Sequence, residues 1–112
     1  MATNIALTTG NMPSVTTEVS LYTAPTNSGG TRIIQFTVNN TIASAASYSL
    51  IVRASGATSA LKDELISNKS IAANDYDILS GTILYLIPPG YELLVKVDTA
   101  DSLTFFASGV AF

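Results

Sequence analysis

The side chains that could do chemistry in this sequence are almost all carboxylates. Its 112 residues include no histidine and no cysteine, which removes the imidazole and thiolate groups that most often act as bases, nucleophiles and metal ligands. Catalysis would have to use pairs of Asp and Glu side chains. Asp63 and Glu64 are adjacent, so on a strand they point to opposite faces and cannot share one substrate. The sequence therefore predicts a protein that is not an enzyme.

Two other acidic pairs have the spacing of turns. Asp75 and Asp77 would share one face of a strand, which could suit a Ca²⁺ ion if backbone carbonyls completed the coordination. A solvated turn is the simpler interpretation, because short acidic motifs often match by chance. Asp98 and Asp101 enclose Thr99-Ala100 and are typical of a hairpin turn. We expect no catalytic residue, no metal and no cofactor.

Apolar and polar residues alternate with a period of two along much of the chain. Ile34, Phe36 and Val38, for example, alternate with Gln35 and Thr37. Successive side chains of a strand face opposite sides, so each such segment has one buried and one wetter face. The segments are 15–21, 34–38, 48–53, 91–98 and 103–108, separated by turn-forming residues at 24–30, 55–56, 73–75 and 88–90. The pattern predicts an all-β fold, an antiparallel sandwich or barrel.

Two segments follow this pattern less closely. Residues 59–66 have Leu61, Leu65 and Ile66 at helical spacing, but the segment is short and weakly capped, so a strand is favoured. Residues 1–13 are neutral and rich in threonine. They are typical of an arm that adds a strand to a neighbour's sheet edge.

Charged side chains are scarce. Asp, Glu, Lys and Arg make up 12% of the residues, where about 25% is usual, although 47% of the residues are hydrophobic. An isolated domain of this size needs more charge to keep its surface soluble and unpaired. We infer that other proteins cover part of the surface, and that the chain is a subunit that works by assembling.

The same composition argues against two other kinds of partner. The net charge is −3 and the five basic residues are scattered, so the chain cannot neutralise a run of phosphates and we expect no nucleic acid. Polar side chains interrupt both charge-free stretches, residues 1–17 and 33–52, so we expect neither a signal peptide nor a membrane helix.

The aromatic residues fall into two groups. Phe36, Tyr48 and Phe105 lie on the apolar side of their strands and are predicted to be core. Five others are candidates for a subunit interface: Tyr22, Tyr85, Tyr91, Phe106 and Phe112. Aromatic rings can also stack on sugars, so a carbohydrate-binding module stays open, although the absence of Trp favours the interface. The consecutive apolar residues 83–87 predict a strand whose second face meets another subunit or the arm.

Several turn and strand-boundary motifs resemble those of small β-sandwich structural proteins of tailed bacteriophages. The motifs are Leu21-Tyr22-Thr23-Ala24-Pro25, the strand 33–38 with Asn39-Asn40-Thr41, Leu61-Lys62-Asp63, Ile71-Ala72-Ala73-Asn74 and Pro88-Pro89-Gly90-Tyr91-Glu92-Leu93. The resemblance covers residues 21–112. Ala72 stands where proline is usual and Tyr91 where aspartate is usual.

The resemblance implies a non-enzymatic virion protein with a jelly-roll-like or immunoglobulin-like sandwich, commonly a homotrimer. Such proteins decorate and cement the phage head, or form tail, fibre or neck parts. We therefore predict a capsid decoration protein, assembled in the host cytoplasm, that bridges subunits of the major capsid protein. A tail, fibre or neck component with carbohydrate or receptor binding is the alternative. Residues 1–20 lie outside the match and are predicted to be an arm or added strand that docks, beside a sandwich domain at residues 21–112.

Overall fold

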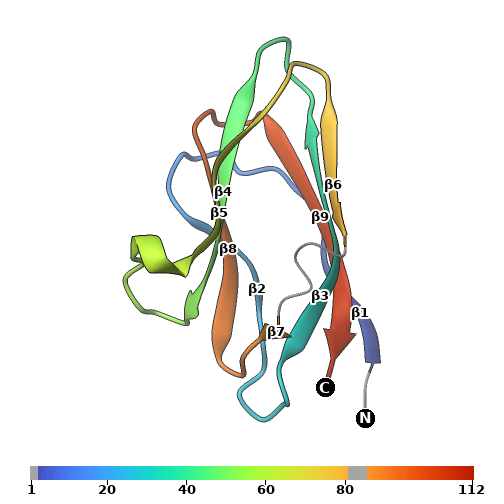
Figure 1. Cartoon of the computed structure of the whole chain (residues 1–112), viewed down its shortest axis with the longest axis vertical. Coiled ribbons are helices and arrows are strands. Elements are labelled where there is room, and N and C mark those ends of the chain that lie inside the picture. Colours follow the sequence, from blue (N-terminus) through green and yellow to red (C-terminus); the bar gives the residue numbers. More distant parts are fainter. Residues whose placement is uncertain (1–2, 81–85) are drawn as a thin grey trace.

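The computed structural model describes residues 3–80 and 86–112, which form two antiparallel sheets packed face to face (Figure 1). One, the β1–β9 sheet, has the order β1-β9-β3-β6, with β7 also pairing with β3; the other, the β2–β8 sheet, has the order β2-β8-β4-β5. The elements are β1 (Thr3–Asn11), β2 (Val19–Thr23), β3 (Thr31–Asn40), β4 (Ala46–Ala54), the 3₁₀ helix η1 (Leu61–Asp63), β5 (Glu64–Ile71), β6 (Tyr76–Ser80), β7 (Leu86–Ile87), β8 (Tyr91–Val97) and β9 (Leu103–Ala111). The predicted all-β antiparallel sandwich is confirmed.

Four antiparallel strand pairs are nested along the chain. The pairs are β1 with β9, β2 with β8, β3 with β6, and β4 with β5. Pairing of β9 with β3 and of β8 with β4 then completes the two sheets. Nested pairs of this kind arise when one long antiparallel hairpin rolls up into two sheets, which is the jelly-roll topology. It is one of the two sandwich types that the resemblance implies.

The core lies between the sheets and is centred on three aromatic rings. Phe36, Tyr48 and Phe105 are fully buried, as predicted. The ring centroids of Phe36 and Phe105 are 5.7 Å apart, and Tyr48 meets Phe105 edge-on at 5.6 Å, both favourable aromatic geometries. Alternate residues of the strands surround the rings, including Ile33, Val38, Leu50, Leu93, Val95 and Leu103.

The Tyr48 hydroxyl is buried and makes no hydrogen bond to any described residue. Burial, and to a lesser degree the Asp77 carboxylate, raises the pKa of Tyr48 far above its ordinary value of about 10. In the unfolded chain the phenol ionises near pH 10, whereas in the folded protein it stays protonated. Folding stability is therefore lost as the pH rises above about 10.

We expect Tyr48→Phe to be close to neutral at pH 7 and to make the protein more stable than the wild type at pH 11. The substitution removes the group whose ionisation favours the unfolded chain, and it strands no hydrogen-bond partner among the described residues. Urea denaturation of both proteins at pH 7 and pH 11 measures the difference. An equal loss of stability in both proteins between these pH values would contradict the assignment.

The N-terminal residues belong to the sandwich of their own chain. β1 lies at the edge of the β1–β9 sheet, where Thr3 pairs with Ala111. β1 begins and β9 ends at the same end of the sandwich (Figure 1). The division of the chain near residue 20, and the docking role of residues 1–20, stay predictions. Among the described residues, no helix is long and apolar enough to cross a membrane.

One local prediction is wrong because a β-bulge interrupts the alternation. Strict alternation places Ile34 in the core with Phe36, but the pairing of β3 with β9 shifts between Ile33 and Gln35. The extra residue reverses the faces, so Ile33 is fully buried and Ile34 is 43% exposed.

Three other segments also differ from expectation. Residues 61–63 form η1 and β5 begins only at Glu64, so the strand predicted over residues 59–66 is right only in its last three residues. β2 begins at Val19, four residues later than the alternation predicts. The turn at residues 98–101 joins β8 to β9 and therefore crosses between the sheets, whereas the sequence predicts a hairpin. Residues 83–85 of the predicted doubly buried strand lie outside the described residues.

Candidate functional site

Charged side chains are divided unequally between the two sheets. The outer side of the β2–β8 sheet carries Arg53, Glu92 and Lys96. On the outer side of the β1–β9 sheet, Arg32 is the single charged residue among those described, and it lies at one end, where its guanidinium carbon is 5.8 Å from the Phe112 ring centroid. The scarcity of charge in the composition therefore belongs mainly to one side of the sandwich.

We call the outer side of β1, β9, β3 and β6, apart from Arg32, the uncharged face. Residues paired across antiparallel strands share a face, so the register of these strands defines its members. Its middle row is Thr9, Phe106, Thr37 and Ile78. The other members are Asn4, Ala6, Ile34, Gln35, Asn39, Tyr76, Thr104, Ser108 and Val110.

Three large apolar side chains stand out from the uncharged face. Phe106 is 42% exposed and Ile78 is 48% exposed, and both belong to the middle row, while Ile34 projects at the bulge. The Phe106 ring lies on the backbone of β1, since a Cβ atom at Gly10 would be 3.2 Å from its Cε2 atom. Apolar side chains gathered on one face without ionic groups are typical of a protein interaction surface.

Two shallow hollows lie between these side chains. Thr8, Thr9, Thr37 and Phe106 line the first, and Ala6, Ile34 and Gly109 line the second. Ser108 borders both hollows. The hollows form where small residues of β9, such as Ser108 and Gly109, lie beside the bulkier Phe106 and Ile34. The face therefore offers both projecting and receding apolar surface to a partner.

An ion-pair network covers part of the opposite side of the sandwich. Arg53 Nη1 is 2.9 Å from Glu92 Oε2 and its Nη2 is 3.4 Å from Glu18 Oε1. Arg53 Nε donates to Ser59 Oγ at 2.7 Å, and the Ser59 hydroxyl donates to Glu18 at 2.8 Å. The network ties the segment before β2 and the segment before η1 to the outer side of this sheet.

The same segment around η1 shields apolar residues on that side. Ile51 and Leu94 point away from the core, yet they are only 2% and 3% exposed. Figure 1 shows η1 outside β4, β5 and β8, and η1 contacts β4. No described segment covers the uncharged face in this way. The two outer sides of the sandwich thus differ in both charge and cover.

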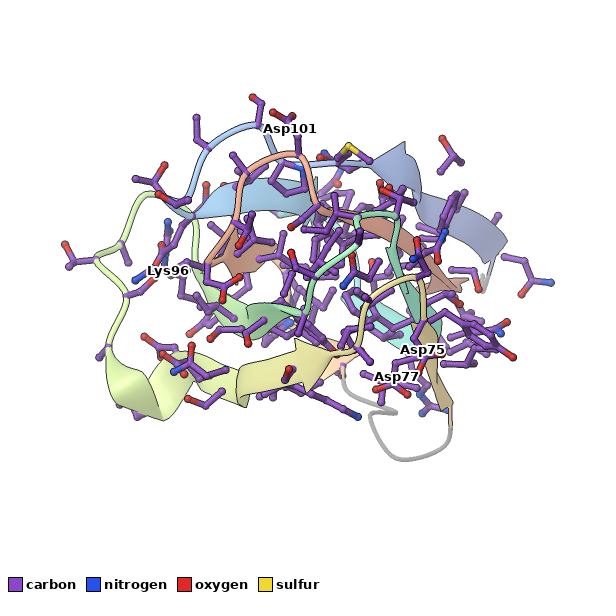
Figure 2. All side chains as sticks on the ribbon, turned by 90° about the horizontal axis from the view of Figure 1, so that it is seen from above. Asp75, Asp77, Lys96 and Asp101 are labelled. Atoms are coloured by element: carbon purple, nitrogen blue, oxygen red, sulfur yellow. The ribbon has the colours of Figure 1, made fainter. Side chains whose placement is uncertain are left out.

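The acidic residues considered for metal binding are engaged elsewhere. Asp77 forms an ion pair with Lys69, and Asp75 Oδ1 accepts a hydrogen bond from the Tyr76 backbone N–H at 2.8 Å. Figure 2 shows Asp75 and Asp77 at one edge of the sandwich, apart from Asp101 and Lys96. Within the described parts of the chain, no group of three or more acidic residues is arranged to hold a metal ion.

Two of the five aromatic interface candidates lie on the same side of the molecule. Phe106 lies at the centre of the uncharged face, and Phe112 follows β9 on the same side, beside Arg32. They are six positions apart in the sequence, or roughly 20 Å of extended chain. Phe112 therefore marks the border of this face.

The three tyrosine candidates lie elsewhere. Tyr22 is half-buried against the core, and its hydroxyl is 2.8 Å from Thr31 Oγ1. Tyr91 is exposed at the start of β8 in the other sheet. Tyr85 lies outside the described residues. Their roles in an interface stay predictions.

Sequence reasoning missed two members of the uncharged face. Strict alternation assigned Ile34 to the core, and Ile78 lies outside every segment for which alternation predicted a strand. The adjacent pair Ile33-Ile34 was a usable signal, since two large apolar residues in succession break a period of two. No local signal in the sequence marks Ile78 as exposed.

Comparison with known proteins adds information on the fold. No protein-family model matches the sequence, and no curated protein matches it. A chain in the crystal structure of the T13 IBDV viral particle has a similar structure, with a TM-score of 0.58 and 9% sequence identity. A chain in the structure of infectious bursal disease virus Gx strain matches with a TM-score of 0.50 and 10% identity. What they share is the fold.

The two matches have the same extent. Each covers 99% of this chain and 30% of the solved chain, so this chain spans about a third of the length of the chains that it matches. At about 10% identity the likeness concerns the β-sandwich alone, and the function has to be argued from the surface of this molecule.

Proposed function

We propose that this chain is a non-enzymatic structural subunit of a virion, and specifically a capsid decoration (cement) protein that bridges and stabilises capsid subunits. The observation that carries the proposal is the uncharged face, which leaves three large apolar side chains in water unless a protein covers it. The similar fold of chains in a viral particle supports a place in a virion. The motifs of residues 21–112 that resemble those of phage β-sandwich proteins support a part of a phage particle.

The mechanism is clamping through many weak contacts. A copy that touches two capsid subunits resists their separation, and copies joined to one another raise the effective concentration of each remaining contact. Contacts made by an uncharged surface depend on apolar burial rather than on ion pairs, so salt screens them little. We therefore expect contacts between copies through the uncharged face to persist at high ionic strength.

The test uses the virus that encodes the chain. We expect mass spectrometry of its purified particles to find the chain in many copies, and particles without it to bind added protein and to withstand higher temperature afterwards. A chain absent from purified particles, or one that never sediments with them, would contradict the proposal.

The second candidate is a tail, fibre or neck component with carbohydrate or receptor binding. Jelly rolls also occur in lectins, and Tyr91 offers an exposed ring away from the uncharged face. Labelled antibody on intact particles distinguishes head from tail. Glycan binding that Tyr91→Ala abolishes, without loss of assembly, would favour this candidate.

A further inference from the structure

We propose that a second copy of this chain covers the uncharged face, in a closed oligomer whose copies turn this face toward the symmetry axis and the β2–β8 sheet outward. The inference rests on one part of the proposed function, namely that another protein molecule covers the uncharged face. It adds the identity of the protein that covers it.

The distribution of charge favours a second copy on this face. The molecule carries a net charge of −3, and its acidic residues lie outside the uncharged face. Two copies that meet through this face bring neutral surfaces together and keep their acidic segments apart. Contact through the other sheet would instead desolvate Arg53 and its two glutamates. The uncharged face has no charged side chain that could pair with a strongly charged partner, and Arg32 lies only at its end.

The size of the face suits a small but specific interface. Three strands of nine or ten residues and the five-residue β6 lie about 4.8 Å apart, and at roughly 3.3 Å per residue they give a surface of roughly 500 Å². Two such surfaces together bury roughly 1,000 Å², about the least area that a specific protein interface needs. The apolar residues lie within this area and the single charge at its end, as in an interface with an apolar centre and a polar rim.

The shape of the face allows it to meet itself. Copies that meet through one shared surface need projections and hollows on the same patch. Phe106 and Ile34 project, and the two hollows beside Ser108 recede. A twofold or threefold arrangement can therefore place the projections of one copy near the hollows of the next.

The edge of the same sheet is less suited to self-association than its face. β1 is uncharged and lies at the edge, but its pairing with β9 shifts between Ala6 and Thr8 and again between Thr9 and Asn11. Bulges of this kind bend an edge strand and interrupt the row of groups that another strand would pair with. We therefore assign the contact to side chains on the face.

The decisive experiment compares the mass in solution of two variants that add the same charge to opposite sides. The monomer mass is 11.7 kDa, and we expect light scattering to give two or three times this value for the wild type. Phe106→Asp places a carboxylate at the centre of the uncharged face and is expected to give a monomer. Ser20→Asp, on the exposed outer side of β2, is expected to leave the mass unchanged.

Several outcomes would overturn the inference. These are a monomeric wild type, a Phe106→Asp protein that keeps the wild-type mass, or a wild-type oligomer that dissociates when NaCl is raised from 50 mM to 500 mM. Circular dichroism shows whether Phe106→Asp is folded. If it is not, Thr37→Asp in the same row takes its place, with the same expected mass.

The outcomes also separate this inference from the proposed function. A monomer that sediments with virus particles would overturn self-association and leave the decoration role intact. An oligomer that dissociates on Phe106→Asp substitution but is absent from virus particles would support self-association and contradict the virion role.

Discussion

Replacing Gly109 with alanine is expected to destabilise the fold strongly. A Cβ atom at Gly109 would overlap the carbonyl oxygen of Arg32 and lie 3.2 Å from its carbonyl carbon. Both atoms belong to the backbone of β3, so no side chain can rotate away and β3 itself would have to move from β9. We expect Gly109→Ala to lower the free energy of unfolding by about 3 kcal/mol or more. Urea denaturation followed by circular dichroism measures the loss.

Gly56→Ala is the matched control for this substitution. Gly56 has a φ of 80°, but a Cβ atom there would meet no atom within 4 Å. Its cost is therefore that of the left-handed backbone alone, roughly 1–2 kcal/mol. Equal losses for the two variants would show that the overlap between β9 and β3 relaxes easily, contrary to the prediction.

The second large effect is expected at Asn40, which is buried at the end of β3. Its Nδ2 group donates to the carbonyl oxygens of Ser44, Ile71 and Ala72 at 2.9–3.1 Å, and its Oδ1 accepts from the Ile42 backbone N–H at 3.0 Å. One side chain thus joins β3 to the end of β5 in the other sheet. Asn40→Asp keeps the shape, but at pH 7 it sets a carboxylate against three carbonyl oxygens.

We expect Asn40→Asp to cost about 3 kcal/mol or more at pH 7, since a buried carboxylate oxygen that faces three carbonyl oxygens adds to the lost hydrogen bonds. Thermal denaturation measures the effect. Asn27→Asp makes the same exchange in the exposed turn before β3 and is expected to change stability by less than about 0.5 kcal/mol. Similar melting temperatures for Asn40→Asp and the wild type would show that the Asn40 hydrogen bonds contribute little.

The core of the sandwich was predictable because its signal is local. Phe36, Tyr48 and Phe105 each sit in a segment of strict alternation, and burial of one strand face requires only that period. Ile34 was mispredicted because its position depends on a bulge, and the bulge forms where β3 meets Gly109. Strand order lay beyond local patterns, since pairing of β1 with β9 joins the two ends of the described chain.

The scarcity of charge was visible in the sequence, but its concentration on one side of the molecule was not. Low charge is a property of composition, which says nothing about the side of the molecule that lacks charge. The middle row of the uncharged face combines Thr9, Thr37, Ile78 and Phe106, from four strands that only the folded topology brings together. The half-buried position of Tyr22 was also beyond local patterns, because a register shift between Ser20 and Tyr22 turns its ring toward the core.

The pairing of Thr3 with Ala111 has a consequence for how this unit can be combined with others. A polypeptide that enters and leaves a domain at adjacent points can be spliced into a surface loop of a host protein without forcing that loop apart. The same proximity permits circular permutation: a linker of a few residues would join the old termini, and a cut in the open turn at Gly56 would create new ones. The sandwich is thereby suited to be a transplantable module.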